Sequence, residues 1–169
     1  MEFNVDQMVC KLSCPGELSG ITYFKQFNIY DNILLDDINR CINDIDVTIP
    51  KVDIYFVKVI DTKKGVSLEG QYLSGKKLIV LGNIFLNFVI NYYADSRKNN
   101  CKIVSEVVNV CLPFSEFIIV PNKSYDCKEI SIRYLIEDVT TRNLCDKKIF
   151  ISVTMLIQYL DEKKFWGYK

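Results

Sequence analysis

Apolar and polar residues alternate with a period of two along much of the chain, which is the pattern of half-buried β-strands. The clearest example is 148–159, where every odd-numbered residue is apolar. In 51–61 the same alternation assigns Val52, Ile54 and Phe56 to the inward face. By this criterion, further strands are expected at 21–30, 77–91, 102–112, 114–120 and 129–138.

The segment 77–91 is apolar on both of its sides. Its even-numbered positions are apolar apart from Gly82, and its odd-numbered positions mix large apolar residues with Asn83, Asn87 and Asn91. A strand with apolar residues on both sides is partly covered on both. A glycine inside a strand commonly marks a bulge or a bend, so one is predicted at Gly82.

One stretch departs from the alternation. Its apolar residues recur at helical spacing, at Leu34, Ile38, Cys41, Ile42 and Ile45. Asp31 or Asn32 can cap the start of a helix, and Pro50 follows the stretch. We therefore predict one short helix near residues 33–45.

Taken together, these elements predict a mostly-β fold. Strands separated by turn signals, including glycines at 65, 70 and 75, favour an antiparallel β-sandwich or a partly closed barrel of about 7–8 strands, with the one short helix. The length of 169 residues fits one domain. We assign residues 1–20 to a flexible N-terminal arm, 21–159 to a β domain and 160–169 to a C-terminal tail.

The charge balance limits the classes of partner. The chain carries 21 basic and 21 acidic residues, so its formal net charge is zero. Nucleic-acid binding needs a basic excess or a basic stripe, and we predict no nucleic-acid partner. A chain without net charge lacks the mutual repulsion that keeps copies apart, which favours protein partners, including a second copy in a homo-oligomer.

Neither a membrane span nor a signal peptide is expected. No stretch approaches the roughly 18 consecutive apolar residues of a membrane-spanning helix. The first residues include Glu2 and Asp6 and do not form a basic segment followed by an apolar run, which is the pattern of a secretory signal. The sequence therefore predicts synthesis in the cytoplasm.

The residue types argue against catalysis. The chain contains no histidine, which removes the commonest general base and the triads that depend on imidazole. Glu137 and Asp138 are adjacent acids, but neighbours on a strand point to opposite faces and do not converge on one proton or metal ion. We predict that the protein is not an enzyme and has neither catalytic residues nor a cofactor.

The seven cysteines do not follow a metal-binding pattern. Cys10 and Cys14 are the closest pair, and a structural zinc site needs a second close pair or histidines, so we predict no metal site. An odd number of cysteines does not pair fully within one chain, and most are expected to be small buried thiols. Cys10 and Cys14 on the arm are candidates for a disulfide between chains.

Aromatic residues in the tail and near 92 supply candidate binding sites. Phe165, Trp166 and Tyr168 either lie as a strap over the edge of the core or anchor a protein partner. Tyr92 and Tyr93, together with Trp166, are candidates for an aromatic platform that recognises a wall glycan.

Phe117 is a further candidate for partner binding. It lies in a segment bracketed by Pro113 and Pro121. Proline has no N–H group, which confines such a segment to an edge or a corner of a sheet. An edge strand is a place where a partner can add a β-segment of its own.

Two groups of residues carry a resemblance to a known family. The first is Ser67-Leu68-Glu69-Gly70 with Leu73-Ser74-Gly75-Lys76-Lys77-Leu78-Ile79-Val80 and Gly82, and the second is Pro113-Phe114-Ser115 with Phe117-Ile118 and Val120-Pro121. Ile136-Glu137-Asp138 and Ile149-Phe150 follow in order. With these motifs, residues 25–157 resemble the SPOCS domain of clostridial spore-coat morphogenetic proteins.

The resemblance implies a β-rich interaction module that acts in assembly of the spore envelope, here as a single module without the LysM domain of larger family members. It implies a non-catalytic structural protein that self-associates in the coat or exosporium and is deposited on the spore surface after synthesis in the mother cell. One alternative is a monomeric adaptor that docks a spore-coat morphogenetic protein. Another is a module that binds cell-wall glycan.

Overall fold

The computed structural model describes residues 22–35, 42–68, 70–94, 102–124, 130–145 and 147–160. These residues form eight strands, and every pairing between strands is antiparallel. The strands are β1 (Phe24–Leu34), β2 (Ile42–Asp61), β3 (Gly65–Val66), β4 (Tyr72–Leu73), β5 (Lys76–Ala94), β6 (Lys102–Ile119), β7 (Ser131–Cys145) and β8 (Lys148–Leu160). The fold is therefore mostly β, and the described ranges contain no helix.

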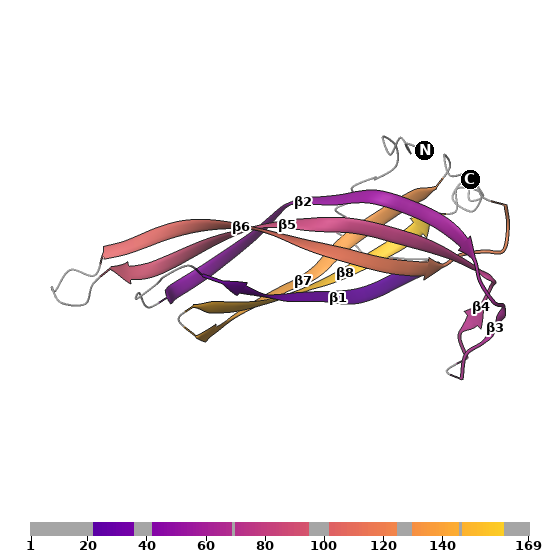
Figure 1. Cartoon of the computed structure of the whole chain (residues 1–169), viewed down its shortest axis with the longest axis horizontal. Coiled ribbons are helices and arrows are strands. Elements are labelled where there is room, and N and C mark those ends of the chain that lie inside the picture. The colour runs from indigo at the N-terminus through magenta and orange to yellow at the C-terminus, as the bar shows by residue number, and fades with distance from the viewer. Residues whose placement is uncertain are drawn as a thin grey trace, which may run out of the picture.

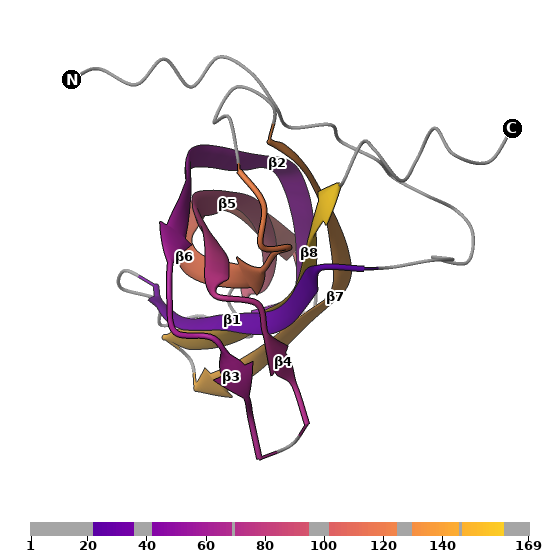
Figure 2. The same cartoon turned by 90° about the vertical axis from the view of Figure 1, so that its right-hand side faces the viewer.

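The long strands form two three-stranded sheets, in the orders β1-β8-β7 and β2-β5-β6, and β3 and β4 form a short hairpin. The two sheets lie over one another along the long axis of the molecule, with the β3–β4 hairpin projecting at one end (Figure 1). Viewed along that axis, the strands curve around a shared interior (Figure 2). Within the described ranges no pairing joins the two sheets, so they do not close into a barrel.

One hydrophobic core fills the space between the sheets. The apolar even-numbered residues of β5 from Leu78 to Ile90 are fully buried, and so are the odd-numbered residues of β8 from Ile149 to Ile157. The odd-numbered residues of β5 between 79 and 91 are half-buried, as their mixed composition predicted. The alternation in the sequence thus identifies the core-facing side of the central strand of each sheet.

Strand β2 changes which of its residues face the core. Val52 and Ile54 are buried, and the register of β2 with β5 shifts directly after Ile54. A bulge adds one residue to one strand, so that residues beyond it face the opposite way. Phe56, which the simple alternation assigned to the inward face, is only half-buried. Val57 and Val59 pack against the core in its place.

The predicted helix near 33–45 is wrong at both of its ends. Leu34 belongs to β1, and Ile42 and Ile45 belong to β2, while residues 36–41 lie outside the described ranges. Ile42 and Ile45 both pack against the core although they are three positions apart, because the β2–β5 register shifts between Ile42 and Asp44. A β-bulge therefore reproduces the spacing that favoured a helix.

Residues 102–112 and 114–120 were predicted as separate strands, but the single strand β6 runs from Lys102 to Ile119. Pro113 lies within it and is paired with Asn83 of β5. Strand β6 is at the edge of its sheet, where a residue without an N–H group is tolerated. The prolines therefore predicted the edge position correctly, but Pro113 does not interrupt the strand.

Gly82 lies where three strands approach one another closely. It pairs with Phe114 of β6 and with Ile54 of β2, beside the register shift in β2. A Cβ atom at this position would lie 2.6 Å from the carbonyl oxygen of Asp53 and would also clash with the ring of Phe114. The irregularity predicted at Gly82 is present on the neighbouring strand, and the glycine leaves space for the phenylalanine ring.

The described part of the predicted β domain contributes to a single core, which includes Phe27 near its start and Tyr159 near its end. The predicted arm 1–20 and residues 161–169 of the predicted tail lie outside the described ranges.

Candidate functional site

A pocket of about 480 Å³ is lined by residues of the β3–β4 hairpin and of the neighbouring strand ends. Figure 1 shows this hairpin projecting at one end of the molecule. The start of β1, strand β4 and the end of β6 form its walls. The aromatic rings and side-chain amides that line it belong to Tyr23, Phe24, Gln71, Tyr72, Phe117 and Asn122. The pocket therefore combines residues from three segments that are far apart in the sequence.

The backbone at Tyr23 holds an unusual conformation on the first wall of the pocket. Its φ angle is 58°, in the left-handed region that non-glycine residues seldom adopt. The N–H of Tyr159 donates to the carbonyl of Tyr23 at 3.0 Å, and Nε2 of Gln158 donates to the carbonyl of Thr22 at 3.1 Å. These two hydrogen bonds from β8 fix the turn at Tyr23. The turn lies directly before β1, so it sets where the first residues of β1 stand in the pocket.

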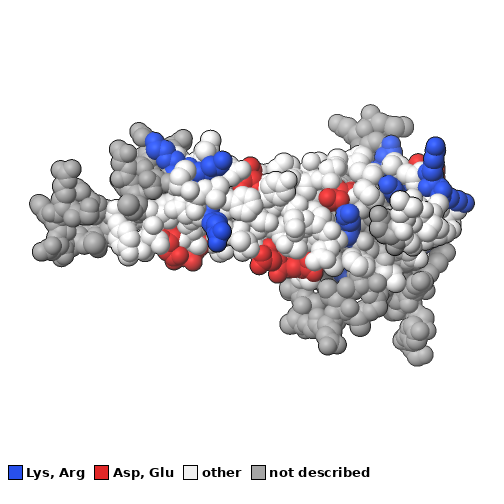
Figure 3. Space-filling model, turned by 90° about the horizontal axis from the view of Figure 1, so that it is seen from below, with Lys and Arg blue, Asp and Glu red and all other residues white. Residues whose placement is uncertain are grey.

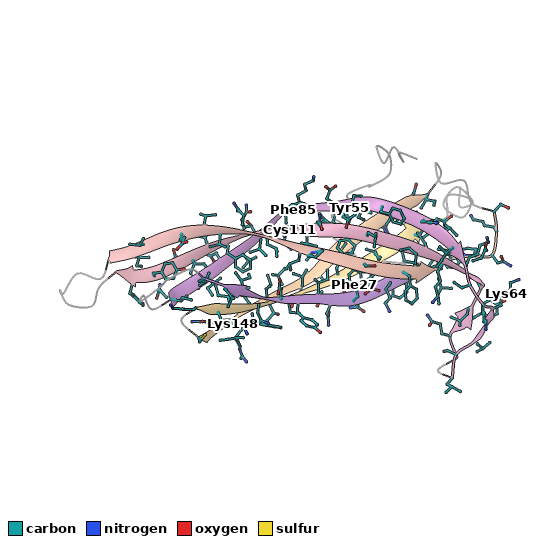
Figure 4. The ribbon with its side chains drawn as sticks, viewed as in Figure 1. Phe27, Tyr55, Lys64, Phe85, Cys111 and Lys148 are labelled. Carbon is teal, nitrogen blue, oxygen red and sulfur yellow. The ribbon has the colours of Figure 1, made fainter. Side chains whose placement is uncertain are left out.

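Ser74 extends the second wall beyond β4, next to Gly75, where the hairpin joins β5. The hydroxyl of Ser74 donates to the carbonyl of Val120 and accepts the N–H of Lys76 at 3.2 Å. Gly75 has a φ angle of +92°, and a Cβ there would lie 2.6 Å from Cγ of Lys64. A glycine is required because the turn is left-handed and the lysine stem covers it, at the base of the projecting hairpin (Figure 4).

Phe117 on the third wall is flanked by two cations. Nζ of Lys77 lies 4.0 Å from the centre of its ring, and Nζ of Lys25 lies 5.4 Å from it. Ammonium groups at these distances interact favourably with an aromatic face. Phe117 is 36% exposed, so this ring is both held in place and accessible.

The chemistry of the pocket suits a side chain of a protein partner. Among the lining residues in the described ranges, aromatic rings and amides are accompanied by Lys25, and none is acidic. Tyr72 is 69% exposed at the rim. Such a site fits an apolar or aromatic side chain whose neighbour carries a carboxylate, because the rings bury the apolar part and the ammonium groups attract the charge.

A second exposed feature is the open edge of β6. In the ranges that the structure describes, β6 pairs with β5 alone, and β5 and β6 extend beyond β1, β7 and β8 at the end opposite the β3–β4 hairpin (Figure 1). Ile103 is 57% exposed and Val107 is 61% exposed in this part of β6. An apolar edge strand without a neighbour is a template for pairing with another chain.

Charged groups do not concentrate on the face seen in Figure 3. Basic and acidic side chains lie there in small separate groups among uncharged residues. This face therefore presents no single field that would select a strongly charged partner.

The structure places only part of the predicted binding residues. Phe117 lines the pocket, whereas Phe165, Trp166, Tyr168, Cys10 and Cys14 lie outside the described residues. The edge position predicted for the segment around Phe117 is confirmed.

One residue of the predicted glycan-binding platform is not accessible to a ligand. Tyr92 is fully buried in the core, whereas Tyr93 is exposed. Successive residues of a strand point to opposite faces, so these two rings do not share a surface. A sugar platform built from Tyr92 and Tyr93 is therefore excluded by the geometry of β5.

The expectation that most cysteines are buried fails for those described. Cys111 and Cys145 are free and exposed. Cys111 lies on the outward side of β6 opposite Phe85, with which it is paired (Figure 4). Cys145 closes β7 beside a shift in its register with β8. The exposure of the two thiols is thus set by where each residue lies in its strand and not by the apolar character of the thiol.

The adjacent acids of β7 lie at a shift in its register with β8, between Ile136 and Asp138, so the strict alternation of faces assumed from the sequence does not hold there. The carboxylate of Glu137 accepts a hydrogen bond from Nε2 of Gln26 at 2.7 Å, and that of Asp138 accepts one from the hydroxyl of Thr140 at 2.7 Å. Both acids are exposed. In the described part of the chain, no three acidic or sulfur-bearing side chains gather in a way that would hold a metal ion.

No helix among the described residues is long and apolar enough to cross a membrane. Comparisons of the chain with protein-family models, with curated proteins and with solved structures find no match.

Phe24 and Tyr72 were not identified from the sequence. In the sequence, Tyr72 lies between Gly70 and Gly75, and an aromatic residue between two glycine turns was the available signal. Both glycines do adopt positive φ angles. Phe24 has no such signal, because it enters the pocket only through the turn at Tyr23.

Proposed function

We propose that this protein is a non-catalytic, self-associating structural module of the bacterial spore envelope. In this proposal its two sheets form a SPOCS-like antiparallel β-sandwich. The chain is synthesised in the mother cell and deposited on the spore surface, in the coat or the exosporium. The resemblance of its motifs to the SPOCS domain supports the cellular setting, and the physical features of the fold support the self-association.

The open edge of β6 is the observation that carries the proposal. Most proteins protect an edge strand with lysines, prolines, bulges or a covering segment. Residues 102–112 contain one lysine, one glutamate and no proline, and their register with β5 has no bulge. A long edge of this kind favours assembly between chains.

Charge and thiols are consistent with the same function. A net charge of zero leaves little electrostatic repulsion between copies. Cys111 and Cys145 are exposed, so an oxidant such as molecular oxygen can join thiols of adjacent chains once they have assembled. Cross-linking of this kind would make a spore layer resistant to dissociation.

The motifs that resemble the SPOCS domain also lie together. The unit that includes Ser74 and Lys76 and the unit that includes Val120 are joined by the hydroxyl of Ser74, which donates to the carbonyl of Val120, and by the N–H of Val120, which donates to the carbonyl of Lys76 at 3.3 Å. Motifs that contact one another support a shared structural role in the proposed domain.

Solution mass tests the proposal. Light scattering during size-exclusion chromatography should show assemblies whose mass rises with protein concentration. Part of that mass should persist without reductant and fall when reductant is added. A monomer at all concentrations in both conditions would rule out self-association.

The pocket favours a second candidate function, a monomeric adaptor. Here an aromatic or apolar side chain of a spore-coat morphogenetic protein would occupy the pocket beside Phe117. Phe117→Glu should abolish binding to such a purified protein, because it removes the ring and adds a negative charge to the wall. Tyr55→Glu is the matched control, since Tyr55 is 46% exposed on β2 and does not line the pocket. Equal binding by the two variants would exclude the pocket.

A further inference from the structure

The outward face of the β5–β6 hairpin carries alternating apolar and polar cross-strand pairs. The apolar pairs are Tyr93 with Ile103, Val89 with Val107, and Phe85 with Cys111. The polar pairs between them are Asn91 with Ser105, and Asn87 with Asn109. The hydroxyl of Ser105 donates to Oδ1 of Asn91 at 2.7 Å. Because opposite residues on one face of a sheet interact directly, each pair forms a row across the two strands.

The backbone of β6 offers hydrogen-bonding groups along its open side. The N–H of Val120 donates to the carbonyl of Lys76, so the even-numbered positions of this strand bond toward β5. The β5–β6 register runs without a shift back to Lys102. In an antiparallel ladder the direction alternates from residue to residue, and the odd-numbered residues from Ile103 to Cys111 therefore direct their N–H and C=O groups away from β5.

Pro113 agrees with this assignment and limits the open edge. It is odd-numbered and has no N–H group, and a proline within a sheet is found where its nitrogen faces away from the neighbouring strand. The side of β6 that is available for pairing therefore ends next to Pro113. Ile103 to Cys111 form the part that can accept a complete additional strand.

The order of apolar and polar residues along this part is symmetric about Val107. Ile103 and Cys111 are apolar at its two ends, and Ser105 and Asn109 are polar between each end and the centre. A strand with such symmetry matches its own copy in antiparallel orientation. Ile103 then lies opposite Cys111, Ser105 opposite Asn109, and Val107 opposite Val107 of the other copy.

We propose that β6 pairs with β6 of a second copy, antiparallel and centred on Val107. This inference rests on the self-association proposed above and specifies its interface. The pairing joins two three-stranded sheets, β2-β5-β6 of each copy, into one continuous sheet of six strands. Every apolar row and every polar row then continues across the two-fold axis into the other copy. Five residue pairs with exchanged N–H and C=O groups give roughly ten hydrogen bonds.

A second copy fits this edge better than a partner of high charge. Lys102 and Glu106 are the only charged residues in 102–112, and their charges cancel. Centring on Val107 places the two copies of Glu106 diagonally across the pairing, each opposite Val108 of the other chain. Like charges in such positions repel modestly, so Glu106→Gln should tighten association by about two- to fivefold.

Cysteine cross-linking tests the register. The seven native cysteines are replaced by alanine, light scattering confirms the wild-type mass, and single cysteines are introduced before oxidation with diamide, which takes up the two electrons and two protons released per disulfide. Paired residues in a sheet lie within the Cα distance that a disulfide spans. Val107→Cys should give a covalent dimer. Ser105→Cys should cross-link poorly with itself but readily with Asn109→Cys. Efficient self-cross-linking of Ser105→Cys without that of Val107→Cys would overturn the register.

A charge at the centre of the interface provides a test in the otherwise native chain. Val107→Lys places two lysines opposite each other and should weaken association by about tenfold or more. Val66→Lys is the matched control, because Val66 is 67% exposed on β3, and it should associate like the native chain. If the native chain assembles and Val107→Lys assembles equally well, the β6 interface is wrong while self-association stands. If the native chain is monomeric, both proposals fail.

Discussion

Strand β6 has two halves that share a neighbour but differ in burial. In residues 112–119 the strand lies against β1, where the rings of Phe114 and Phe27 have centres 5.7 Å apart. Residues 102–111 pair with the same strand β5 in the same unbroken register, yet Val104, on the same face of the strand as Phe114, is 39% exposed. Hydrogen bonding to β5 therefore orders the whole strand, but only contact with the second sheet buries it.

The two halves of β6 therefore differ in role, one in the stability of the fold and the other in assembly. The covered half contributes to the core and to the pocket, and the open half presents a pairing edge. Substitutions in the covered half should change the free energy of unfolding, whereas substitutions in the open half should change association. Four experiments test or sharpen this division.

The largest effect is expected from Phe114→Ala. Truncating this buried ring beside Phe27 should lower the free energy of unfolding by about 3–5 kcal/mol, because a cavity remains in the core. Val107→Ala in the open half should change it by less than about 1 kcal/mol. Urea unfolding of the two variants measures both values. Equal losses would show that the two halves are equally buried in solution.

Gly82→Ala should be the next most damaging change. The new methyl group would lie against the Phe114 ring and the Asp53 carbonyl, which should cost about 1–3 kcal/mol. Gly65→Ala is the control, since a Cβ at Gly65 has no heavy atom within 4 Å, and it should change stability by less than about 0.5 kcal/mol. A Gly82→Ala variant as stable as the control would mean that Phe114 does not pack over β5.

A smaller effect distinguishes the two lysines that flank Phe117 in the covered half. A double-mutant cycle between Lys77→Met and Phe117→Leu should give a coupling energy of about 0.5–1 kcal/mol. The corresponding cycle with Lys25→Met should give less, because Nζ of Lys25 is 5.4 Å from the ring centre and Nζ of Lys77 is 4.0 Å from it. A reversed order would contradict the geometry of this wall.

The smallest effect is expected in the pH dependence of the free energy of unfolding, through Tyr134 of β7 in the opposite sheet. Burial of Tyr134 raises the pKa of its hydroxyl above 10.0 by desolvation. The unfolded chain then loses this proton first, so the free energy of unfolding should fall as the pH rises from 10.0 toward the folded-state pKa. Tyr134→Phe should remove this part of the decrease, because the variant has no hydroxyl at this buried position. Urea unfolding at a series of pH values on both sides of 10.0 measures the difference. Parallel curves for the native chain and Tyr134→Phe would refute the prediction.

Most strands were predictable because a regular sheet has a period of two. In β8 the odd-numbered residues from Ile149 to Ile157 alternate without interruption, and all of them are buried. Strand β2 was less predictable, because each bulge reverses the side that faces the core. Ile42 and Ile45 were therefore misread as helical, since a register shift and a helix both place apolar residues three positions apart.

The candidate site was predictable only in part. The prolines around Phe117 indicated an edge strand, because an absent N–H group restricts where a residue fits in a sheet. The pocket itself also needs Phe24 and Tyr72, which come from β1 and β4 and are adjacent only after the chain folds.

The sequence by itself determined the β class of this protein, the inward sides of its central strands and the alternation along β6. These properties depend on residues one or two positions apart, whose relation the backbone geometry sets directly. Tertiary structure alone decided which half of β6 is covered, where the bulges reverse β2, and which rings meet in the pocket. Those properties depend on which distant segments come together, because a side chain is buried only by what packs against it.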